Sequence, residues 1–255
     1  MWPYPRIVAH RGGGTLAPEN TIAAMRCGLD HGFRAVEFDV MLAKDGVPVV
    51  MHDPQLGRTV AGEGSIADFT AQELAARDAG IWFGPEFEGE PVPTYEQVAR
   101  FCMQHGIWMN VEIKPVPGHE EQTGWSVAQA TWRLFAGQPD HRAAALPLLS
   151  SFSFAALEAA RFAAAEIPRG LLIDEVPADW HAQLRQLGAI SLHVNHRRLT
   201  PVLARAVKEA GFGLFCYTVN DPVRARQLLE WGVDGFCTDR IDLIGAQFAG
   251  SVVER

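Results

Sequence analysis

Ala35-Val36-Glu37-Phe38-Asp39-Val40 combines the composition of a buried β-strand with two carboxylates that stand two residues apart. Successive side chains of a strand point to opposite faces, so Glu37 and Asp39 project to the same face. Acids on a strand that is otherwise suited to burial need a partner such as a cation. The stretch therefore predicts a core strand that carries part of a metal site.

The same spacing recurs in Asn110-Val111-Glu112-Ile113-Lys114-Pro115, where Glu112 and Lys114 share one face. A single strand acid is more often half of an ion pair than a metal ligand, and Lys114 could simply neutralise Glu112. Glu37 and Asp39 beside Glu112 change that balance, because three oxygen ligands together suit a hard cation. Charged pairs on two core strands therefore indicate an active site.

Short apolar, β-branched runs alternate with longer helical stretches, which is the pattern of βα units around a parallel sheet. About eight such runs are present, the number that a closed (β/α)8 barrel, or TIM barrel, requires. The expected strands are Arg6–His10, Ala35–Met41, Trp108–Lys114, Pro147–Phe152, Gly170–Ile173, Ile190–Val194, Gly213–Val219 and Gly235–Thr238. We expect an α/β fold in which residues 1–255 form a single barrel domain.

Capping signals mark where the helices between these strands begin and end. Thr94 with Gln97 forms a capping box, and Ser153, Thr200 and Asp221 are expected to cap the starts of later helices. Glycines stand just before the expected strands, where the left-handed conformation ends a helix at little steric cost. They are Gly32, Gly106, Gly188, Gly211 and Gly232.

One segment interrupts this alternation. A hairpin with its turn at Lys44-Asp45-Gly46 is expected to follow the second strand and to carry His52 back toward the mouth of the barrel. Residues 53–93 then contain a capping box at Thr70 and Glu73 but no strong barrel strand. We expect a small inserted subdomain after the second strand and its hairpin.

Composition narrows the classes of function. The chain has 30 acidic and 22 basic residues, a formal charge of −8, which disfavours a nucleic-acid partner or an anionic membrane surface. Neither a signal peptide nor an apolar stretch long enough for membrane insertion is visible, and the four cysteines form no CxxC pair. We expect a cytoplasmic protein with reduced cysteines. A homodimer through the barrel helices is compatible with the pattern, although no distinctive interface signal is present.

Reactive groups of a barrel enzyme lie at the carboxyl ends of its strands. Acids that offer only oxygen ligands suit Mg²⁺ or Ca²⁺ better than Zn²⁺. Arg11 and Lys114 supply positive charge for a phosphate group, and the backbone of Gly12-Gly13-Gly14 can approach an anion. His10 and His52 stand where one takes a proton from a nucleophile and the other gives one to a leaving alkoxide. Together these groups indicate phosphoester cleavage.

Several motifs, in this order and spacing, resemble the glycerophosphodiester phosphodiesterase family. They are His10-Arg11-Gly12, Pro18-Glu19-Asn20-Thr21, Glu37-Phe38-Asp39, His52-Asp53-Pro54, Glu112-Ile113-Lys114-Pro115, Thr218-Val219-Asn220, Asp234-Gly235 and Thr238-Asp239. The resemblance spans nearly the whole chain and is closest to the cytosolic bacterial branch. It implies a barrel enzyme that hydrolyses substrates such as glycerophosphocholine or glycerophosphoethanolamine to sn-glycerol 3-phosphate and an alcohol.

The resemblance also implies roles for individual residues. Glu37, Asp39 and Glu112 would bind a divalent cation, Mg²⁺ or Ca²⁺. His10 and His52 would be the general acid and base, in an order that stays open, as does the choice between water and the glycerol 2-hydroxyl as first nucleophile. Arg11 and Lys114 would hold the phosphate. Tyr217 stands where many members of the family carry Trp, and it would contact the substrate.

Two alternatives remain at this stage. A related barrel phospholipase D or phosphoinositide-type lipase would need an apolar loop that faces lipid, and Ile81-Trp82-Phe83-Gly84 is the candidate. A non-catalytic barrel that binds a phosphate ligand would not need both His10 and His52.

Other side chains are expected to have structural roles. Asp239, which follows the eighth expected strand, is expected to cap the last helix first and to be a ligand second. Glu19 and Asn20 could equally reach the site or precede the first helix, which Asn20 or Thr21 would cap. His193 is at least as well explained by a structural hydrogen bond as by contact with substrate. Four phenylalanines are expected in the core or in the layer beneath the helices, namely Phe38, Phe152, Phe215 and Phe236.

Overall fold

The computed structural model describes residues 2–136 and 146–251, and within these ranges eight parallel strands close into a barrel. The strands are β1 (Ile7–His10), β2 (Ala35–Leu42), β4 (Trp108–Ile113), β5 (Leu148–Ser151), β6 (Arg169–Ile173), β7 (Ser191–Asn195), β8 (Gly213–Tyr217) and β9 (Gly235–Thr238). They pair in the order β1-β9-β8-β7-β6-β5-β4-β2, and β1 also pairs with β2 to close the ring. The predicted TIM barrel is confirmed, and each expected strand ends within two residues of an observed one.

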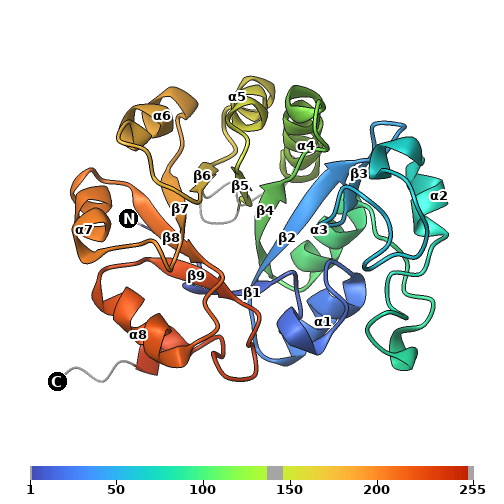
Figure 1. Cartoon of the computed structure of the whole chain (residues 1–255), viewed down its shortest axis with the longest axis horizontal. Helices are drawn as coiled ribbons and strands as arrows, with labels where there is room; N and C mark the ends of the chain where they lie inside the picture. Colours follow the sequence, from blue (N-terminus) through green and yellow to red (C-terminus); the bar gives the residue numbers. More distant parts are fainter. Residues whose placement is uncertain (1, 137–145, 252–255) are drawn as a thin grey trace.

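Helices surround the strands on the outside of the barrel (Figure 1). They are α1 (Ile22–Asp30), α2 (Ala71–Ala75), α3 (Tyr95–Gln104), α4 (Glu120–Phe135), α5 (Phe154–Ala163), α6 (Trp180–Leu187), α7 (Pro201–Glu209) and α8 (Pro222–Glu230). None of the helices in the described ranges is long and apolar enough to cross a membrane.

The capping predictions for α3, α5, α7 and α8 are confirmed. Thr94 and Gln97 form a capping box at the start of α3, and the side chains of Ser153, Thr200 and Asp221 accept backbone N–H bonds at the starts of α5, α7 and α8. The five glycines expected after helices all have positive φ, between 57° and 88°. Local chemistry thus sets most helix boundaries.

The predicted hairpin is also present. β3 (Pro48–Val50) runs antiparallel to the end of β2, with Val50 opposite Val40. Residues 53–93 then contribute α2 and short 3₁₀ turns but no barrel strand, and α2 has the expected capping box at Thr70 and Glu73. Apolar side chains of this segment pack in a small cluster together with Met41 of β2 and Val49 of β3. The segment lies beside β3 in Figure 1. Its status as a separate subdomain stays a prediction.

Aromatic side chains fill the amino-terminal end of the barrel. Tyr4 stacks on Trp108 with ring centroids 4.4 Å apart, and Trp2 stacks on Phe215 at 5.8 Å. Tyr4 precedes β1 and Trp108 begins β4, so this packing lies where the strands start. The interior is therefore open for chemistry at the carboxyl ends of the strands, as is general in such barrels.

The last βα unit differs from the expectation. Among the described residues, β9 is followed by turns and a 3₁₀ helix, Phe248–Ser251, and by no α-helix. The prediction that Asp239 caps a last helix is therefore wrong. Its carboxylate has another partner, described below.

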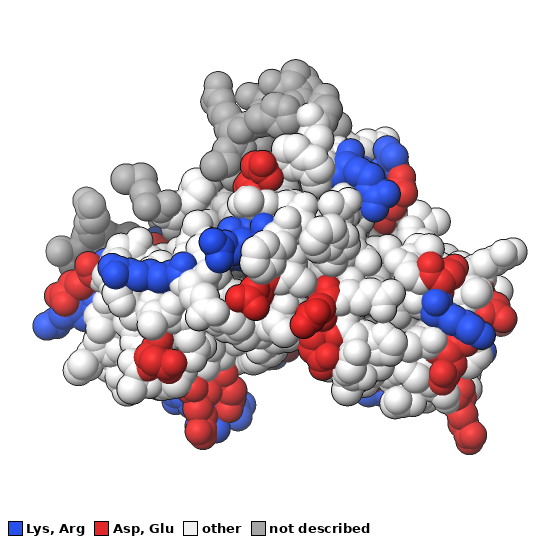
Figure 2. All heavy atoms as spheres, turned by 90° about the horizontal axis from the view of Figure 1, so that it is seen from above, with Lys and Arg blue, Asp and Glu red and all other residues white. Residues whose placement is uncertain are grey.

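Charges of both signs mix on the surface. On the face shown in Figure 2, the coloured Lys and Arg side chains lie among Asp and Glu side chains rather than in one broad basic area. This distribution agrees with the acidic net charge of −8.

Candidate active site

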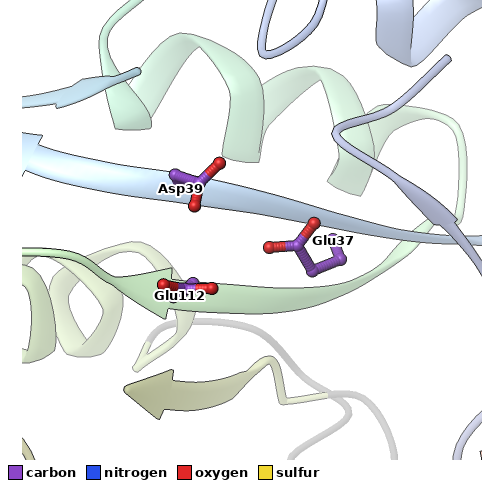
Figure 3. Close-up of side chains that lie close together, drawn as sticks. All are labelled: Glu37, Asp39 and Glu112. Atoms are coloured by element: carbon purple, nitrogen blue, oxygen red, sulfur yellow. The ribbon is translucent and has the colours of Figure 1, made fainter. Parts of the chain in front are cut away.

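Three acids meet at neighbouring positions of β2 and β4. Glu37 and Asp39 leave β2 on the same side, and Asp39 pairs in register with Glu112 of β4. One carboxylate oxygen of each residue lies within 4.8 Å of the other two, and Figure 3 shows the side chains facing one another across the two strands. Their exposed fractions are 4%, 1% and 9%. The structure thus brings together the three residues predicted to bind a metal.

Their electrostatics fit a divalent cation. Burial raises the pKa of Glu37 to about 7 and that of Glu112 to about 8, and the charge of Asp39 adds to both shifts. Burial acts on Asp39 too, but Lys114 and Arg11 outweigh it and lower its pKa to about 2. A divalent cation would favour the ionised form of all three acids. Three carboxylates that repel one another and offer oxygen ligands therefore suit a divalent cation.

Two basic side chains border this acidic cluster. Arg11 follows β1 with a left-handed φ of 51°, and its backbone N–H donates to Glu37 Oε2 at 3.2 Å. Its Nε lies 3.5 Å from Asp39 Oδ2 and is buried without a hydrogen bond to any described residue. Lys114 Nζ lies 3.3 Å from Asp39 Oδ1 and 3.6 Å from Glu112 Oε1. Both residues therefore carry N–H donors beside the acids.

Each predicted catalytic histidine is held by an aspartate. Nδ1 of His10 lies 2.5 Å from Asp239 Oδ1, and its Nε2 lies 3.6 Å from Glu37 Oε2. Nδ1 of His52 lies 2.6 Å from Asp53 Oδ1. Hydrogen bonds outweigh burial and lower the pKa of both aspartates, so both are acceptors at neutral pH. Nδ1 of each ring therefore carries a proton, and Nε2 is left for other partners.

The two rings differ in their charge environment. Burial lowers the pKa of His52, and the nearby cations Arg11 and Lys114 add to the decrease. Burial also acts on His10, but the charges of Glu37 and Asp239 outweigh it and raise the pKa of that ring.

One cavity of about 210 Å³ is lined by both histidines, the three acids, Arg11 and Lys114. Aromatic residues, including Phe152 and Tyr217, line another part of it. The two rings meet edge to face with centroids 5.5 Å apart, and the Tyr217 hydroxyl donates to the carbonyl of Ile173 at 3.1 Å. The cavity therefore has a polar wall and an aromatic wall.

Phe152 corrects an expectation. Phe38, Phe215 and Phe236 are buried as predicted, but 49% of Phe152 is exposed and it lines the cavity. It follows β5 directly, at the end of the barrel where the site opens. The assignment of Phe152 to the core is therefore wrong.

Asp239, for which the sequence favoured a capping role over a ligand role, and Asn20, for which it left both a site role and a capping role open, are both site residues. Asp239 holds His10 instead of capping a helix, and Asn220 donates to its Oδ2 at 2.8 Å. Thr21 caps α1, whereas Asn20, with a φ of 63°, donates to Asp39 Oδ2 at 2.9 Å. The position of Asp239 directly after a strand was the available signal for its role.

The glycine run has a packing role. A Cβ on Gly14 would lie 2.1 Å from the Asp239 carbonyl oxygen, and one on Gly12 would lie 2.9 Å from the backbone of α1. The loop after β1 is therefore packed against the backbone of Asp239 on one side and against α1 on the other. Approach of this backbone to an anion stays a prediction.

His193 and the apolar segment considered as a lipid-facing loop were two further candidates from the sequence. His193 is fully buried, with Nε2 3.0 Å from Ser191 Oγ, which fits the structural hydrogen bond, although the residue also lines the cavity. Ile81 and Trp82 are 44% and 40% exposed and are not among the residues that line the cavity.

Comparison with known proteins identifies a family and several relatives that are similar to this chain. The glycerophosphoryl diester phosphodiesterase family matches residues 10–243. A glycerophosphodiester phosphodiesterase of Caldanaerobacter subterraneus subsp. tengcongensis is 35% identical over 238 residues, covering 91% of this chain and 93% of that relative.

Two solved structures agree. A phosphodiesterase of Oleispira antarctica, in complex with the product sn-glycerol-3-phosphate, is 35% identical with a TM-score of 0.86, and the match covers 96% of each chain. A glycerophosphodiester phosphodiesterase of Agrobacterium tumefaciens is 26% identical with a TM-score of 0.77, covering 96% of this chain and 99% of that one. The match to the family includes the acids, both histidines and Asp239. This chain therefore belongs to the glycerophosphoryl diester phosphodiesterase family.

Proposed function

We propose that this chain hydrolyses water-soluble glycerophosphodiesters, such as glycerophosphocholine, to sn-glycerol 3-phosphate and an alcohol. The observation that carries the proposal is a single cavity that holds a cluster of three carboxylates and two histidines oriented by aspartates. Membership of the family supports the reaction, and the product bound to the Oleispira antarctica relative supports the substrate.

Glu37, Asp39 and Glu112 would hold Mg²⁺ or Ca²⁺, because all three offer hard oxygen ligands. The cation would neutralise charge on the phosphate and act as a Lewis acid toward it. Arg11 and Lys114 would bind the phosphate oxygens. Both residues line the cavity beside the three acids, which supports this role because an anion there would meet two cationic groups.

His10 and His52 would act as the proton-transfer pair. One ring accepts a proton at Nε2 from the attacking hydroxyl, which belongs to water or to the glycerol 2-position. The other donates a proton to the oxygen of the departing alcohol. Asp239 and Asp53 hold Nδ1 of the two rings, so each ring turns its second nitrogen away from its aspartate.

Tyr217 would contact the glycerol part through its ring, since its hydroxyl already donates to the Ile173 carbonyl. Phe152 lies edge to face with Tyr217 and would extend the same apolar wall. A small three-carbon group suits a cavity of about 210 Å³.

A cytoplasmic location and a homodimer stay proposals. All four cysteines are unpaired and three of them are buried, which is compatible with a reducing compartment. Sedimentation of the purified protein at two concentrations would test for a dimer.

Metal dependence tests the function directly. Purified protein should release sn-glycerol 3-phosphate from glycerophosphocholine with Mg²⁺ or Ca²⁺, lose this activity with a chelator and regain it when the cation is restored. Product formation would be measured with glycerol-3-phosphate dehydrogenase. Full activity after exhaustive chelation would contradict the metal role, and cleavage of intact phospholipid vesicles in preference to the deacylated substrate would favour the lipase alternative.

The leaving group distinguishes the two histidines. His10→Ala and His52→Ala should each lower kcat on glycerophosphocholine by about 10²-fold or more. With a p-nitrophenyl phosphodiester, whose leaving group needs no proton, the loss should shrink for the variant that lacks the general acid. Equal losses on both substrates for both variants would refute the division of roles.

A further inference from the structure

A chain of charged hydrogen bonds leads away from His52. Asp53 accepts from His52 through Oδ1 at 2.6 Å and from Arg58 Nε through Oδ2 at 2.5 Å. Arg58 in turn donates from both terminal nitrogens to Glu19, at 2.8 Å and 2.6 Å. Glu19 Oε1 also accepts from Arg11 Nη1 at 2.7 Å. The guanidinium of Arg58 thus connects Asp53, which holds His52, to Arg11, which would bind the phosphate.

The geometry of this link is specific to a guanidinium. Arg58 uses its Nε–H for Asp53 and its fork of two nitrogens for Glu19, so one rigid plane sets the relative position of two carboxylates. Glu19 and Asp53 are largely covered, with 14% and 24% of their side chains exposed. The pKa of each carboxylate is lowered, because hydrogen bonds and charge from Arg58 outweigh burial.

Arg58 lies on a loop that is held by backbone hydrogen bonds and by buried apolar side chains. Leu56 N–H donates to the Gly64 carbonyl at 3.0 Å, and Gly57 N–H donates to the Val60 carbonyl at 2.8 Å. The side chains of Leu56 and Val60 are buried in the small apolar cluster that this segment forms with β2 and β3. The loop therefore presents Arg58 from outside the barrel strands to Asp53 and Glu19.

The two histidines are supported in different ways. His10 ends β1 and is held by Asp239 directly after the adjacent strand β9, so the barrel itself supplies its support. His52 follows the short strand β3, and its aspartate is the next residue of the same loop. Among the described residues, Asp53 is held from outside that dipeptide by Arg58. His52 therefore depends on a contact that the barrel strands do not provide.

We propose that Arg58 is a positioning residue that orients the His52 ring through Asp53. Because Arg58 and Arg11 share Glu19, Arg58 also sets the position of this ring relative to Arg11, which would bind the phosphate. The role rests on the proposed function of the site. It also gives residues 53–93 a task in the reaction, namely to place one of the two proton-transfer groups.

Arg58→Gln tests this role in two backgrounds. In the otherwise unchanged enzyme, kcat on glycerophosphocholine should fall on the order of 10²-fold, because a small displacement of a proton-transfer group has that cost. KM should change much less. In a His52→Ala background the same substitution should have almost no further effect on kcat, since the group that it positions is absent. Arg58→Lys should recover little, because an ammonium group cannot bridge two carboxylates in one plane.

Arg77→Gln is the matched control. Arg77 belongs to the same segment and carries the same charge, but its Nη1 donates to the Ala61 carbonyl at 3.2 Å rather than to Asp53 or Glu19. This variant should keep the kcat of the unchanged enzyme. If Arg58→Gln lowers kcat equally with and without His52, or no more than Arg77→Gln does, Arg58 has only a structural role and the proposal is overturned.

A second measurement does not need turnover. In protein labelled with ¹⁵N-histidine, Arg58→Gln should shift the His52 ring signals, assigned by their loss in His52→Ala, and leave those of His31 unchanged. Unshifted His52 signals would overturn the positioning role even in an active enzyme. Shifted signals without hydrolysis by the unchanged enzyme would support the positioning role while refuting the proposed function.

Discussion

At the scale of single residues, the site depends on side chains that hold other side chains. Asp239 fixes the tautomer of His10, and Asn20 donates to Asp39 beside the positive groups. Arg11 adopts a left-handed φ of 51°, a conformation that costs a non-glycine residue energy and is common where function constrains the backbone. These supporting contacts decide whether the reactive groups point correctly.

Replacing the aspartate that holds His10 should therefore impair proton transfer. Asp239→Asn can present an amide N–H to Nδ1 and so favours the wrong tautomer, and kcat should fall on the order of 10²-fold while KM changes little. Steady-state kinetics measure this. Asp242→Asn, three residues further on in an exposed pair with Arg240, should leave kcat unchanged. Equal effects of the two substitutions would contradict the role of Asp239.

At the scale of elements, capping chemistry is common to the barrel and to residues 53–93. Thr94 at the start of α3 and Thr70 at the start of α2 each accept from the third residue of the helix and receive a side-chain contact in return. β3 carries His52 to the cavity, and the loop before α2 places Arg58 against Asp53. Elements outside the eight barrel strands thus supply half of the proposed proton-transfer pair.

Cap deletions test whether these elements unfold together. Thr94→Ala and Thr70→Ala should each lower the free energy of unfolding by about 1 kcal/mol. If residues 53–93 belong to one cooperative domain, both variants should show a single transition in urea by fluorescence and by circular dichroism. A separate early transition in Thr70→Ala would instead identify the segment as an independent unit.

At the scale of the whole molecule, closure of the barrel joins residues far apart in the chain. His10 and Asp239 are separated by 229 positions and meet because β1 pairs with β9. The interior of the closed ring also encloses polar groups. His193 is fully buried there, and burial lowers its pKa to about 3 from an ordinary 6.5.

His193 should make the stability of the fold depend on pH. Its pKa is lower in the folded state than in the unfolded state, so the unfolded state binds the extra proton and stability falls as pH decreases from 6.5 toward 3. Between pH 7.5 and pH 5 this group should cost about 2 kcal/mol. Urea unfolding of His193→Gln should show that much less loss over the same range. The exposed His31→Gln should behave like the unchanged protein, and an identical pH dependence in His193→Gln would contradict the assignment.

The sequence by itself determined the strand pattern, the helix caps and the pairing of acids at every second position. These features follow from neighbouring residues, since side-chain direction in a strand has a period of two and a cap acts within one turn of its helix. The acids, both histidines, Arg11 and Lys114 could be selected from the order and spacing of residues along the chain, whereas Tyr217 was selected only through the resemblance to the family, and all of them line one cavity.

Only the tertiary structure decided which side chains support these groups and which residues close the cavity. Asp239 looked like a helix cap and Phe152 like a core residue, because both judgements depend on what lies across the barrel rather than beside them in the chain. Arg58 gave no local signal, since its partner Glu19 lies 39 positions away in the chain and meets it only in the folded structure. Contacts of this kind are set by closure of the ring and the path of its loops, which no local pattern encodes.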